Sequence, residues 1–329
     1  MVTGAQGLLG RHVTAALLRA GAEAVLGVGR SPRADEAYTH DIVWRGAAVR
    51  APTPVDLLTV AADPRYHYQP ADLADEDRLG ELLRAFAPEV VIHTAASLRD
   101  SGWQALIASN LHATVGLVRA AARSGRPRLV LTSSGSVYGA GRGRLPLRED
   151  GPAEPVDPYG VTKRAAEDIA RVLGGEHGMT VVTGRVFNLV GPGLQERHLP
   201  ALLASRIAAA ALHPGPHELA LGPLDATRDF IDVRDAAEAL VLLASMRDPP
   251  PLANVASGRE TRVRQVLDLL VELAGRPPLR LVPAPARSSE IPRAVADVGL
   301  MAAAGFRARH ALEDSLRLML AYYERLGGG

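Results

Sequence analysis

The sequence predicts an α/β protein with a Rossmann-type, doubly wound parallel sheet and a smaller C-terminal α/β region. Short β-branched runs alternate with amphipathic helical stretches over the first two-thirds of the 329 residues, as they do in βαβ units. Three glycines spaced three residues apart also open the first helical stretch. Beyond residue 185 the pattern loosens into Pro- and Gly-rich stretches with shorter elements.

The expected elements follow from these periodicities. Because only Met1 and Val2 precede the glycine turn, the first strand is either a stub or begins upstream of the recorded start. Asp157 and Pro158 supply an N-cap and a first-turn proline for a helix that starts at Tyr159. The expected strands, rich in β-branched residues, span 24–29, 66–69, 90–93, 129–132 and 181–185. The expected helices span 9–20, 75–86, 101–123, 159–173, 199–211, 233–245, 262–274 and 312–325.

Composition and charge argue against several classes of protein. Apolar residues make up 47% of the chain and charged residues 22%, which is ordinary for a soluble globular protein. The net charge of +1 indicates no basic face for nucleic acid. We expect no membrane partner, because no apolar run reaches the roughly 18 residues that span a bilayer, and no signal peptide is evident. The absence of cysteine excludes disulfides and thiolate chemistry and favours a cytoplasmic location. The ten histidines lack the spacing of metal ligands, so no metal site is expected.

The glycine turn predicts a dinucleotide site near the start of the chain. Such glycines allow a tight turn, a close approach of backbone N–H groups to a pyrophosphate, and close packing of the helix that follows. The positive end of that helix favours anionic phosphates. The turn residues that we expect to contact the cofactor are Gly4, Gln6, Gly7, Leu8 and Gly10.

The end of the second strand indicates which dinucleotide binds. An NAD site normally carries an acidic residue there for the ribose 2′-hydroxyl, whereas this chain has Gly29 followed by Arg30 and Ser31. Loss of the carboxylate and gain of a guanidinium suit a 2′-phosphate, so NADP is favoured over NAD. The alternative is that Arg30 is a solvated loop residue. Small and polar residues follow the next two strands where the adenine half is expected, namely Asp72, Leu73, Thr94, Ala95 and Ala96.

The chain contains a single lysine, Lys163, four residues after Tyr159. Positions four apart share one helix face, so the ammonium can lower the phenol pKa and make Tyr159 an acid/base near neutral pH. The alternative is an ordinary surface helix. Ser134 follows the strand 129–132 at the sheet edge where ligands bind, so its hydroxyl can bond the same substrate oxygen as the phenol.

With these residues in place, the chain resembles the extended short-chain dehydrogenase/reductase superfamily, in its NAD(P)-dependent nucleotide-sugar epimerase, dehydratase and reductase branch. The resemblance runs from Val2 to Tyr323. The stretches 222–230 and 287–292 are most similar to the part of the branch that contains GDP-4-keto-6-deoxymannose reductase and NDP-hexose 4-ketoreductases. The other motifs that carry the resemblance are the glycine turn and the segments 93–96, 133–139, 159–163, 185–193 and 228–235.

The resemblance implies a role for individual residues. Tyr159 would be the acid/base, Lys163 its partner and a contact of the nicotinamide ribose, and Ser134 a donor to the reacting oxygen. Asn110 matches a family asparagine with a supporting role at the cofactor site. The residues implied to bind a nucleotide-diphosphate sugar are Ser134, Ser136, Asn188, Arg228 and Arg287, and for each arginine the alternative is a surface salt bridge.

The resemblance also implies a domain division and an assembly. Residues 1–185, about 227–256 and part of the C-terminal tail would form the dinucleotide-binding domain. Residues 186–226 and 257–326 would form the substrate-binding region. The helices 101–123 and 159–173 would form a homodimer interface.

Three reactions use such a scaffold: 4,6-dehydration, 4-epimerisation and 4-keto reduction. Ser134 is followed by Gly135 and Ser136, which cannot supply the acid and base that a dehydratase needs. Epimerases return their hydride and usually keep NAD, so the end of the second strand favours NADP-dependent reduction of an NDP-4-keto-6-deoxyhexose at sugar C4. The main alternative is an NAD-dependent nucleotide-sugar 4-epimerase. More distant alternatives are an idle cofactor-binding protein and a reductase of a non-nucleotide ketone.

Overall fold

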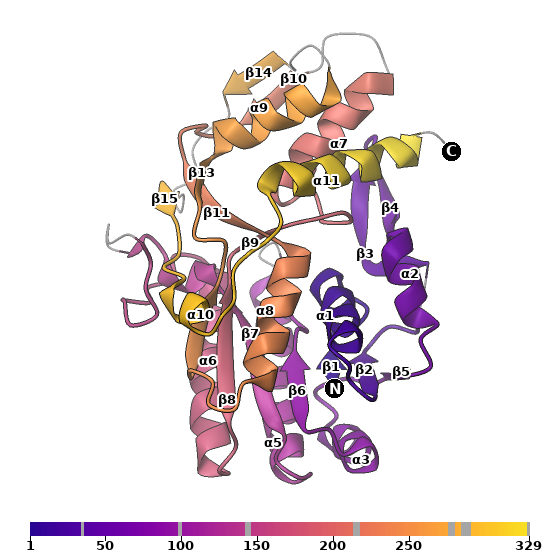
Figure 1. Ribbon diagram of the computed structural model, residues 1–329, viewed down its shortest axis with the longest axis vertical. Coiled ribbons are helices and arrows are strands. Elements are labelled where there is room, and N and C mark those ends of the chain that lie inside the picture. Colours follow the sequence, from indigo (N-terminus) through magenta and orange to yellow (C-terminus); the bar gives the residue numbers. More distant parts are fainter. Residues whose placement is uncertain are drawn as a thin grey trace.

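The computed structural model describes residues 1–33, 36–97, 101–141, 146–212, 218–275, 280–283 and 291–327. Its centre is a parallel sheet with the strand order β12-β8-β7-β6-β1-β2-β5 (Figure 1). Across the sheet these strands are β12 (Leu252–Val255), β8 (Val181–Val186), β7 (Arg128–Ser134), β6 (Val90–His93), β1 (Val2–Thr3), β2 (Val25–Gly29) and β5 (Tyr66–Pro70). The predicted Rossmann-type fold class is therefore confirmed.

Helices cover both faces of this sheet, because its strands bury side chains on both sides. On β7, Val130 packs in the cluster that holds α1 (Leu8–Arg19) and α8 (Val233–Ser245). Its neighbours Leu129 and Leu131 pack on the opposite face. The helices that contribute to this second cluster are α3 (Glu76–Phe86), α5 (Ala113–Ala122) and α6 (Pro158–Glu176).

The interior strand β1 has only two residues but pairs with strands on both sides. Val2 lies opposite Gly27 of β2 and Ile92 of β6, and Thr3 continues both ladders. This pairing places the glycine turn that follows Thr3 at the carboxyl edge of the sheet. Parallel sheets bind ligands at that edge.

A second lobe lies beyond the carboxyl edge of the sheet, at the top of Figure 1. Its helices are α7 (Leu199–Leu212), α9 (Val263–Ala274) and α11 (Leu312–Gly327). Its strands are β9 (Asn188–Val190), β10 (Glu218–Leu221), β11 (Thr227–Asp232), β13 (Glu260–Arg262), β14 (Arg280–Pro283) and β15 (Arg293–Ala294). Among the described residues, β10 pairs with β14, and β11 pairs with β9, β13 and β15.

Between residues 30 and 65, where no element was predicted, the structure has a β-hairpin and a helix. These are β3 (Ala37–Trp44), β4 (Ala47–Pro52) and α2 (Val55–Ala61). Figure 1 shows the hairpin reaching away from the sheet toward α7 and α11. Trp44 stacks on Tyr323 with ring centroids 5.9 Å apart, and Tyr322 donates to the Pro52 carbonyl at 3.0 Å. The hairpin therefore belongs to the core of the second lobe.

The predicted helix 101–123 is a continuous helical segment with an irregular first half. It comprises α4 (Trp103–Leu106), the π-helical turn η1 (Ile107–His112) and α5. By length and composition the segment Trp103–Ala122 could cross a membrane, so the expectation that no segment is apolar enough does not hold on that criterion. Half of its apolar window is buried inside the protein, and a buried core helix passes the same test.

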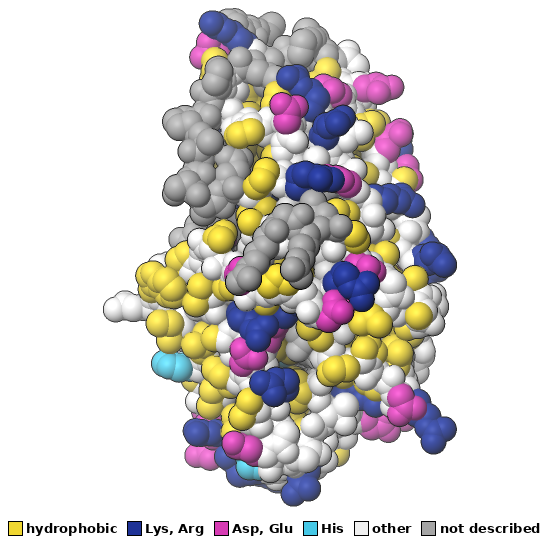
Figure 2. Space-filling view, turned by 90° about the vertical axis from the view of Figure 1, so that its left-hand side faces the viewer, with side chains coloured by type: hydrophobic (Ala, Val, Ile, Leu, Met, Phe, Trp, Pro, Cys, Tyr) yellow, Lys and Arg dark blue, Asp and Glu magenta, His cyan; other side chains and the backbone are white. Residues whose placement is uncertain are grey.

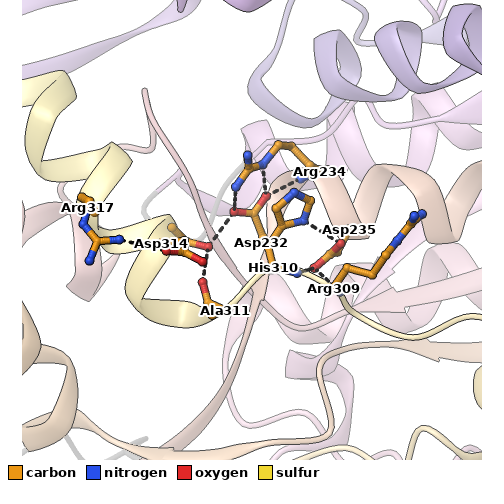
Figure 3. A network of polar contacts seen from close by, with 9 residues as sticks. Asp232, Arg234, Asp235, Arg309, His310, Ala311, Asp314 and Arg317 are labelled. Carbon is orange, nitrogen blue, oxygen red and sulfur yellow. Dashed lines mark hydrogen bonds and ion pairs between the residues drawn. The ribbon is translucent and has the colours of Figure 1, made fainter.

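The C-terminal segment is held to the start of α8 by two buried carboxylates (Figure 3). Asp235 accepts hydrogen bonds from the backbone N–H groups of Arg309 and His310, both at 3.0 Å, and lies 2.8 Å from Nδ1 of His310. Asp232 caps α8 and accepts a hydrogen bond from Ser315 of α11 at 2.6 Å. These contacts fix the position at which the chain passes from the sheet domain into α11 of the second lobe. The short helix α10 (Gly299–Ala303) precedes this segment.

The surface shows no broad charged region on the face drawn in Figure 2. Among the described residues of that face, basic and acidic side chains are interspersed. This pattern agrees with the net charge of +1.

Candidate active site

The single lysine lies at the carboxyl end of β7. Its ammonium donates to the carbonyl oxygen of Thr132 at 2.6 Å, and the side chain is buried. Lys163 is carried by helix α6. This helix begins after Asp157, its N-cap, which accepts from the Gly160 N–H at 2.8 Å. Tyr159 lies one turn before Lys163 and is half-buried, so it retains access to solvent or a ligand.

Burial and nearby charge set the protonation of this lysine. Desolvation lowers the pKa of Lys163 to about 8, and Glu167 acts in the opposite direction. On the neighbouring strand β6, burial, and secondarily the charge of Lys163, lowers the pKa of His93 to about 3. His93 is therefore neutral at physiological pH and does not compete with Lys163 as a cation.

Ser134 and Ser136 lie together at the turn after β7. The Ser134 hydroxyl accepts from the backbone N–H of Ser136 and contacts the Ser136 hydroxyl, both at 3.1 Å. They are held by the short 3₁₀ helix η2 (Gly135–Tyr138). A Cβ at Gly135 would lie 3.1 Å from the Phe187 ring, so a larger side chain at that position needs the ring to move. Neither position following Ser134 offers a carboxylate.

Asn110 links the loop after β6 to helix α6. It is buried within the π-helical turn η1. Its side-chain oxygen accepts from the Ser97 N–H, and its amide donates to the Thr162 hydroxyl, both at 3.0 Å. Thr162 directly precedes Lys163. Asn110 thus connects the loop after β6 to the helix that carries Tyr159 and Lys163.

The glycine turn has the close backbone packing that its sequence predicts. Gly4 has φ +67°, and a Cβ on it would lie 2.7 Å from the backbone nitrogen of Ala95. A Cβ on Gly10 would lie 2.1 Å from the Gly4 carbonyl oxygen. Gly7 is the N-cap of α1, and with no side chain it leaves the first-turn N–H groups open to an anion. The turn therefore fits the diphosphate of a dinucleotide.

Two other turn residues face inward. The Gln6 side chain is buried, donating to the Tyr66 hydroxyl at 3.2 Å and accepting from Arg11 at 2.5 Å. Leu8 is half-buried against the core of the second lobe. Because the Gln6 side chain is bonded to Tyr66 and Arg11, Gln6 can offer a bound diphosphate only its backbone.

The end of β2 is shaped by tyrosines of β5. A Cβ at Gly29 would lie 3.0 Å from the Tyr68 hydroxyl, which donates to the Ser31 carbonyl at 2.5 Å. Arg30 is exposed directly beside this contact. Arg33 lies over the Tyr66 ring at 5.5 Å. This edge presents guanidinium groups, with Tyr68 in the space that the side chain of an acidic residue at position 29 would enter.

The remaining predicted cofactor residues lie along the same edge. Thr94 donates to the Thr3 carbonyl at 2.6 Å, which holds Ala95 against the glycine turn. Asp72 is exposed and accepts from the Ala74 N–H at 2.9 Å, whereas Leu73 is buried. Ala96 is exposed.

Two of the predicted substrate residues lie on paired strands in the second lobe. Asn188 of β9 is exposed and donates to the Asp229 carbonyl at 2.8 Å. Arg228 of β11 is half-buried and donates to the Thr227 carbonyl at 2.8 Å. Arg287 lies outside the described residues.

A buried ionic cluster that was not predicted lies next to Lys163 on α6 and β8. Glu167 accepts two hydrogen bonds from Arg185, at 2.9 and 2.7 Å, and one from the Ser133 hydroxyl at 2.5 Å. The signal available in the sequence was the spacing of Glu167, four residues after Lys163 on the same helix face.

The parallel sheet, the glycine turn before α1 and the Tyr159–Lys163 pair define a protein of the Rossmann class of dinucleotide-binding enzymes. More specifically, residues 1–256 match the NAD dependent epimerase/dehydratase family, and the chain belongs to this family. The resemblance to the extended short-chain dehydrogenase/reductase superfamily is therefore confirmed.

Relatives of this chain include both reductases and epimerases. GDP-6-deoxy-D-mannose reductase of Pseudomonas aeruginosa is 34% identical over 224 residues, which cover 66% of this chain and 72% of that protein. UDP-glucose 4-epimerase of Azospirillum brasilense is 30% identical over 293 residues, which cover 84% of this chain and 77% of that protein. The structure of RMD from Pseudomonas aeruginosa complexed with NADPH is 28% identical with a TM-score of 0.77, covering 99% of this chain and 98% of that one. Family membership thus leaves the type of reaction open.

Proposed function

We propose that the protein reduces the 4-keto group of an NDP-4-keto-6-deoxyhexose with NADPH. The observation that carries this proposal is the combination at the end of β7: a hydroxyl at Ser134, a buried ammonium at Lys163, and no carboxylate at positions 135 and 136. A dehydratase needs a further acid and base at such a site, whereas a ketone reduction needs one proton donor and stabilisation of an alkoxide. The similarity to GDP-6-deoxy-D-mannose reductase supports the same reaction.

In this mechanism Tyr159 and Ser134 act on the oxygen at sugar carbon 4, and Lys163 acts through Tyr159. Bound NADPH would supply the hydride to sugar carbon 4. Tyr159 donates its phenolic proton to the oxygen on that carbon as negative charge develops. Ser134 donates a hydrogen bond to the same oxygen, and the Lys163 ammonium stabilises the resulting phenolate. Because all three sit on rigid elements, little reorganisation is needed during the reaction.

NADP is proposed as the cofactor on the geometry at the end of β2. A Cβ at position 29 would lie 3.0 Å from the Tyr68 hydroxyl, so an acidic side chain there would crowd this tyrosine, and exposed Arg30 offers a charge-assisted contact to a 2′-phosphate. The NADPH complex of RMD is a similar structure that supports this assignment.

For the substrate, Asn188 and Arg228 are proposed to bind the diphosphate, with Arg287 joining them. Paired strands β9 and β11 bring the first two into one lobe above the catalytic edge. Arginine suits a diphosphate because its planar fork donates two parallel hydrogen bonds.

The test is a panel of nucleotide sugars with NADPH or NADH, read by cofactor absorbance and product analysis. The proposal expects NADPH oxidation that depends on a 4-keto-6-deoxy sugar nucleotide, with one hydride incorporated at carbon 4. The alternative function is an NAD-dependent 4-epimerase, which the similarity to UDP-glucose 4-epimerase supports. Interconversion of two unreduced sugar nucleotides without net cofactor loss would establish that alternative and overturn the reductase.

A homodimer is proposed on the outer faces of α4, η1 and α6. Trp103 is 53% exposed, and Ile107, Val161 and Val172 are also exposed apolar side chains on these helices. These side chains lie on neighbouring helices, and an interface between two copies would remove them from water. Light scattering should give about twice the 34.7 kDa monomer mass, and Trp103→Glu with Val161→Glu should shift it to monomer; a wild-type monomer contradicts the proposal.

The cytoplasm is the proposed location, because a soluble NADPH pool would supply the reaction.

A further inference from the structure

Glu167 and Arg185 form an ion pair that is almost entirely removed from solvent. Their side chains are 8% and 2% exposed. Arg185 donates from Nε and one terminal nitrogen to the two carboxylate oxygens, in a bidentate geometry. The guanidinium also lies over the Tyr138 ring, 4.6 Å from its centroid. An ion pair in such a position is weak evidence for stability alone, because its desolvation cost offsets the attraction.

The ion pair is connected both to helix α6, which carries Lys163, and to the end of β7, where the Thr132 carbonyl accepts from the lysine. Glu167 lies one helical turn after Lys163 on α6, so the two side chains share a face. Glu167 also accepts from the hydroxyl of Ser133, the residue directly after Thr132, whose carbonyl holds the lysine. In the β7–β8 ladder, Ser133 lies opposite Arg185. The cluster therefore clamps α6 to the ends of two strands at the point where the ammonium is bound.

The charges facing Lys163 from the surrounding elements favour Glu167 as its counter-ion. On β6, His93 is neutral because burial lowers its pKa to about 3. On β8, Arg185 is already engaged by the carboxylate and the Tyr138 ring. The helix bearing Asn110 contributes uncharged groups, and Tyr159 on α6 is the group that the lysine serves. Among the described residues, Glu167 is thus the facing carboxylate.

We propose that Glu167, fixed by Arg185 and Ser133, is the positioning residue that keeps Lys163 charged and seated against Thr132. This inference deepens the proposed function, since it assigns what maintains the ammonium that Tyr159 requires. Glu167 need not touch substrate or cofactor. It acts through the lysine.

The single lysine allows a direct test that does not depend on turnover. Protein labelled with ¹³C-lysine gives one side-chain signal, and its pH titration reports the pKa of Lys163 alone. In Glu167→Gln the pKa should fall by about 1 or more, because an adjacent opposite charge is lost. The double variant Glu167→Gln with Arg185→Met removes both buried charges, so it keeps the test available if the single variant does not fold. Its Lys163 pKa should also fall.

Two controls separate charge from general damage. Asp168→Asn removes the next carboxylate on α6, which is half exposed and paired with Arg164, and should leave the Lys163 pKa unchanged. Ser133→Ala removes one bond to Glu167 but keeps both charges, so the Lys163 pKa should stay within a few tenths of wild type. An unchanged pKa in Glu167→Gln and in the double variant, or an equal fall in Asp168→Asn, would overturn the proposal.

Turnover gives a second readout. The alkaline limb of kcat in Glu167→Gln should move to lower pH, with kcat at pH 8 reduced about five-fold if the pKa falls by 1, and with the KM for NADPH nearly unchanged. A uniform loss of kcat at every pH would indicate a merely structural role. If wild type reduces no 4-keto sugar, the proposed function fails, whereas the lysine titration still decides the role of Glu167.

Discussion

The ammonium of Lys163 and the carbonyl oxygen of Thr132 lie 2.6 Å apart in the buried layer between α6 and β7. One hydrogen bond to a neutral carbonyl does not compensate for removing an ammonium from water. This cost of burial lowers the pKa of Lys163 from the ordinary lysine value of 10.5 to about 8. The site therefore holds a cation where folding disfavours it, which is typical of a functional group.

Replacing this lysine should stabilise the fold and abolish turnover. The folded protein releases the lysine proton above about pH 8, whereas the unfolded chain holds it to about 10.5, so wild-type stability gains with pH across that window. Below pH 8 the cost of the buried ammonium is fully present. Lys163→Met should thus be more stable at pH 7 by up to about 3 kcal/mol, reduced by the lost bond to Thr132.

Urea unfolding of wild type and Lys163→Met at pH 7 and pH 10 checks this prediction. The difference in unfolding free energy should shrink at pH 10. A difference of the same size at both values would mean that the lysine is not a buried cation.

Removing the phenolic proton should stop the chemistry without disturbing the cofactor site. Tyr159→Phe keeps the ring on α6 but lacks the group proposed to protonate the sugar oxygen, so kcat should fall about 10² to 10⁴-fold. The Kd for NADPH, measured by fluorescence, should change little. Retained turnover would assign the proton donor to another residue.

The glycine turn should not accept a methyl group at position 10. A Cβ there lies 2.1 Å from the Gly4 carbonyl, a backbone atom that cannot move without opening the turn. Gly10→Ala should cost about 1–3 kcal/mol of stability and lose dinucleotide binding. Gly175→Ala is the matched control, because a Cβ there meets nothing within 4 Å and helix propensity improves. Calorimetry with NADPH distinguishes the two variants.

Arg30 should select between the two cofactors. If its guanidinium binds a 2′-phosphate, Arg30→Ala should raise the KM for NADPH about ten-fold or more and leave the KM for NADH unchanged. Arg50→Ala serves as control, since Arg50 forms an exposed ion pair with Asp41 on the hairpin. Equal loss with both cofactors would show that Arg30 does not read the phosphate.

Local spacing makes the glycine turn and the Tyr159–Lys163 pair visible in the sequence, whereas contacts between distant segments are not visible there. The glycine turn and the Tyr159–Lys163 pair are visible in sequence because each lies within one turn of the chain. The hairpin at residues 37–52 was missed because its apolar side chains are buried against α7 and α11, more than 140 residues later. Arg185 pairs with Glu167 across a strand and a helix, so its partner could not be read from its own segment. Tertiary contacts override local pattern in both cases.

The polar contacts in Figure 3 predict unequal contributions to stability from Asp235 and Asp314. Both backbone N–H groups bond the same oxygen of buried Asp235, and its other oxygen faces Nδ1 of His310, so Asp235→Asn removes the negative charge that these groups bond and places an amide N–H₂ group where one of the oxygens now lies. Hydrogen bonds to charged groups contribute about 1.5–3 kcal/mol, and a loss of that order is expected in the unfolding free energy. Asp314→Asn is the control, because Asp314 is 61% exposed in its pair with Arg317 and should cost well under about 1 kcal/mol. Hydrogen exchange should show faster opening of α11 in Asp235→Asn alone, because Asp235 holds the segment that leads into that helix. Equal exchange in both variants would mean that another contact anchors α11. The hydrogen bond from Ser315 to Asp232 would then be the next contact to remove.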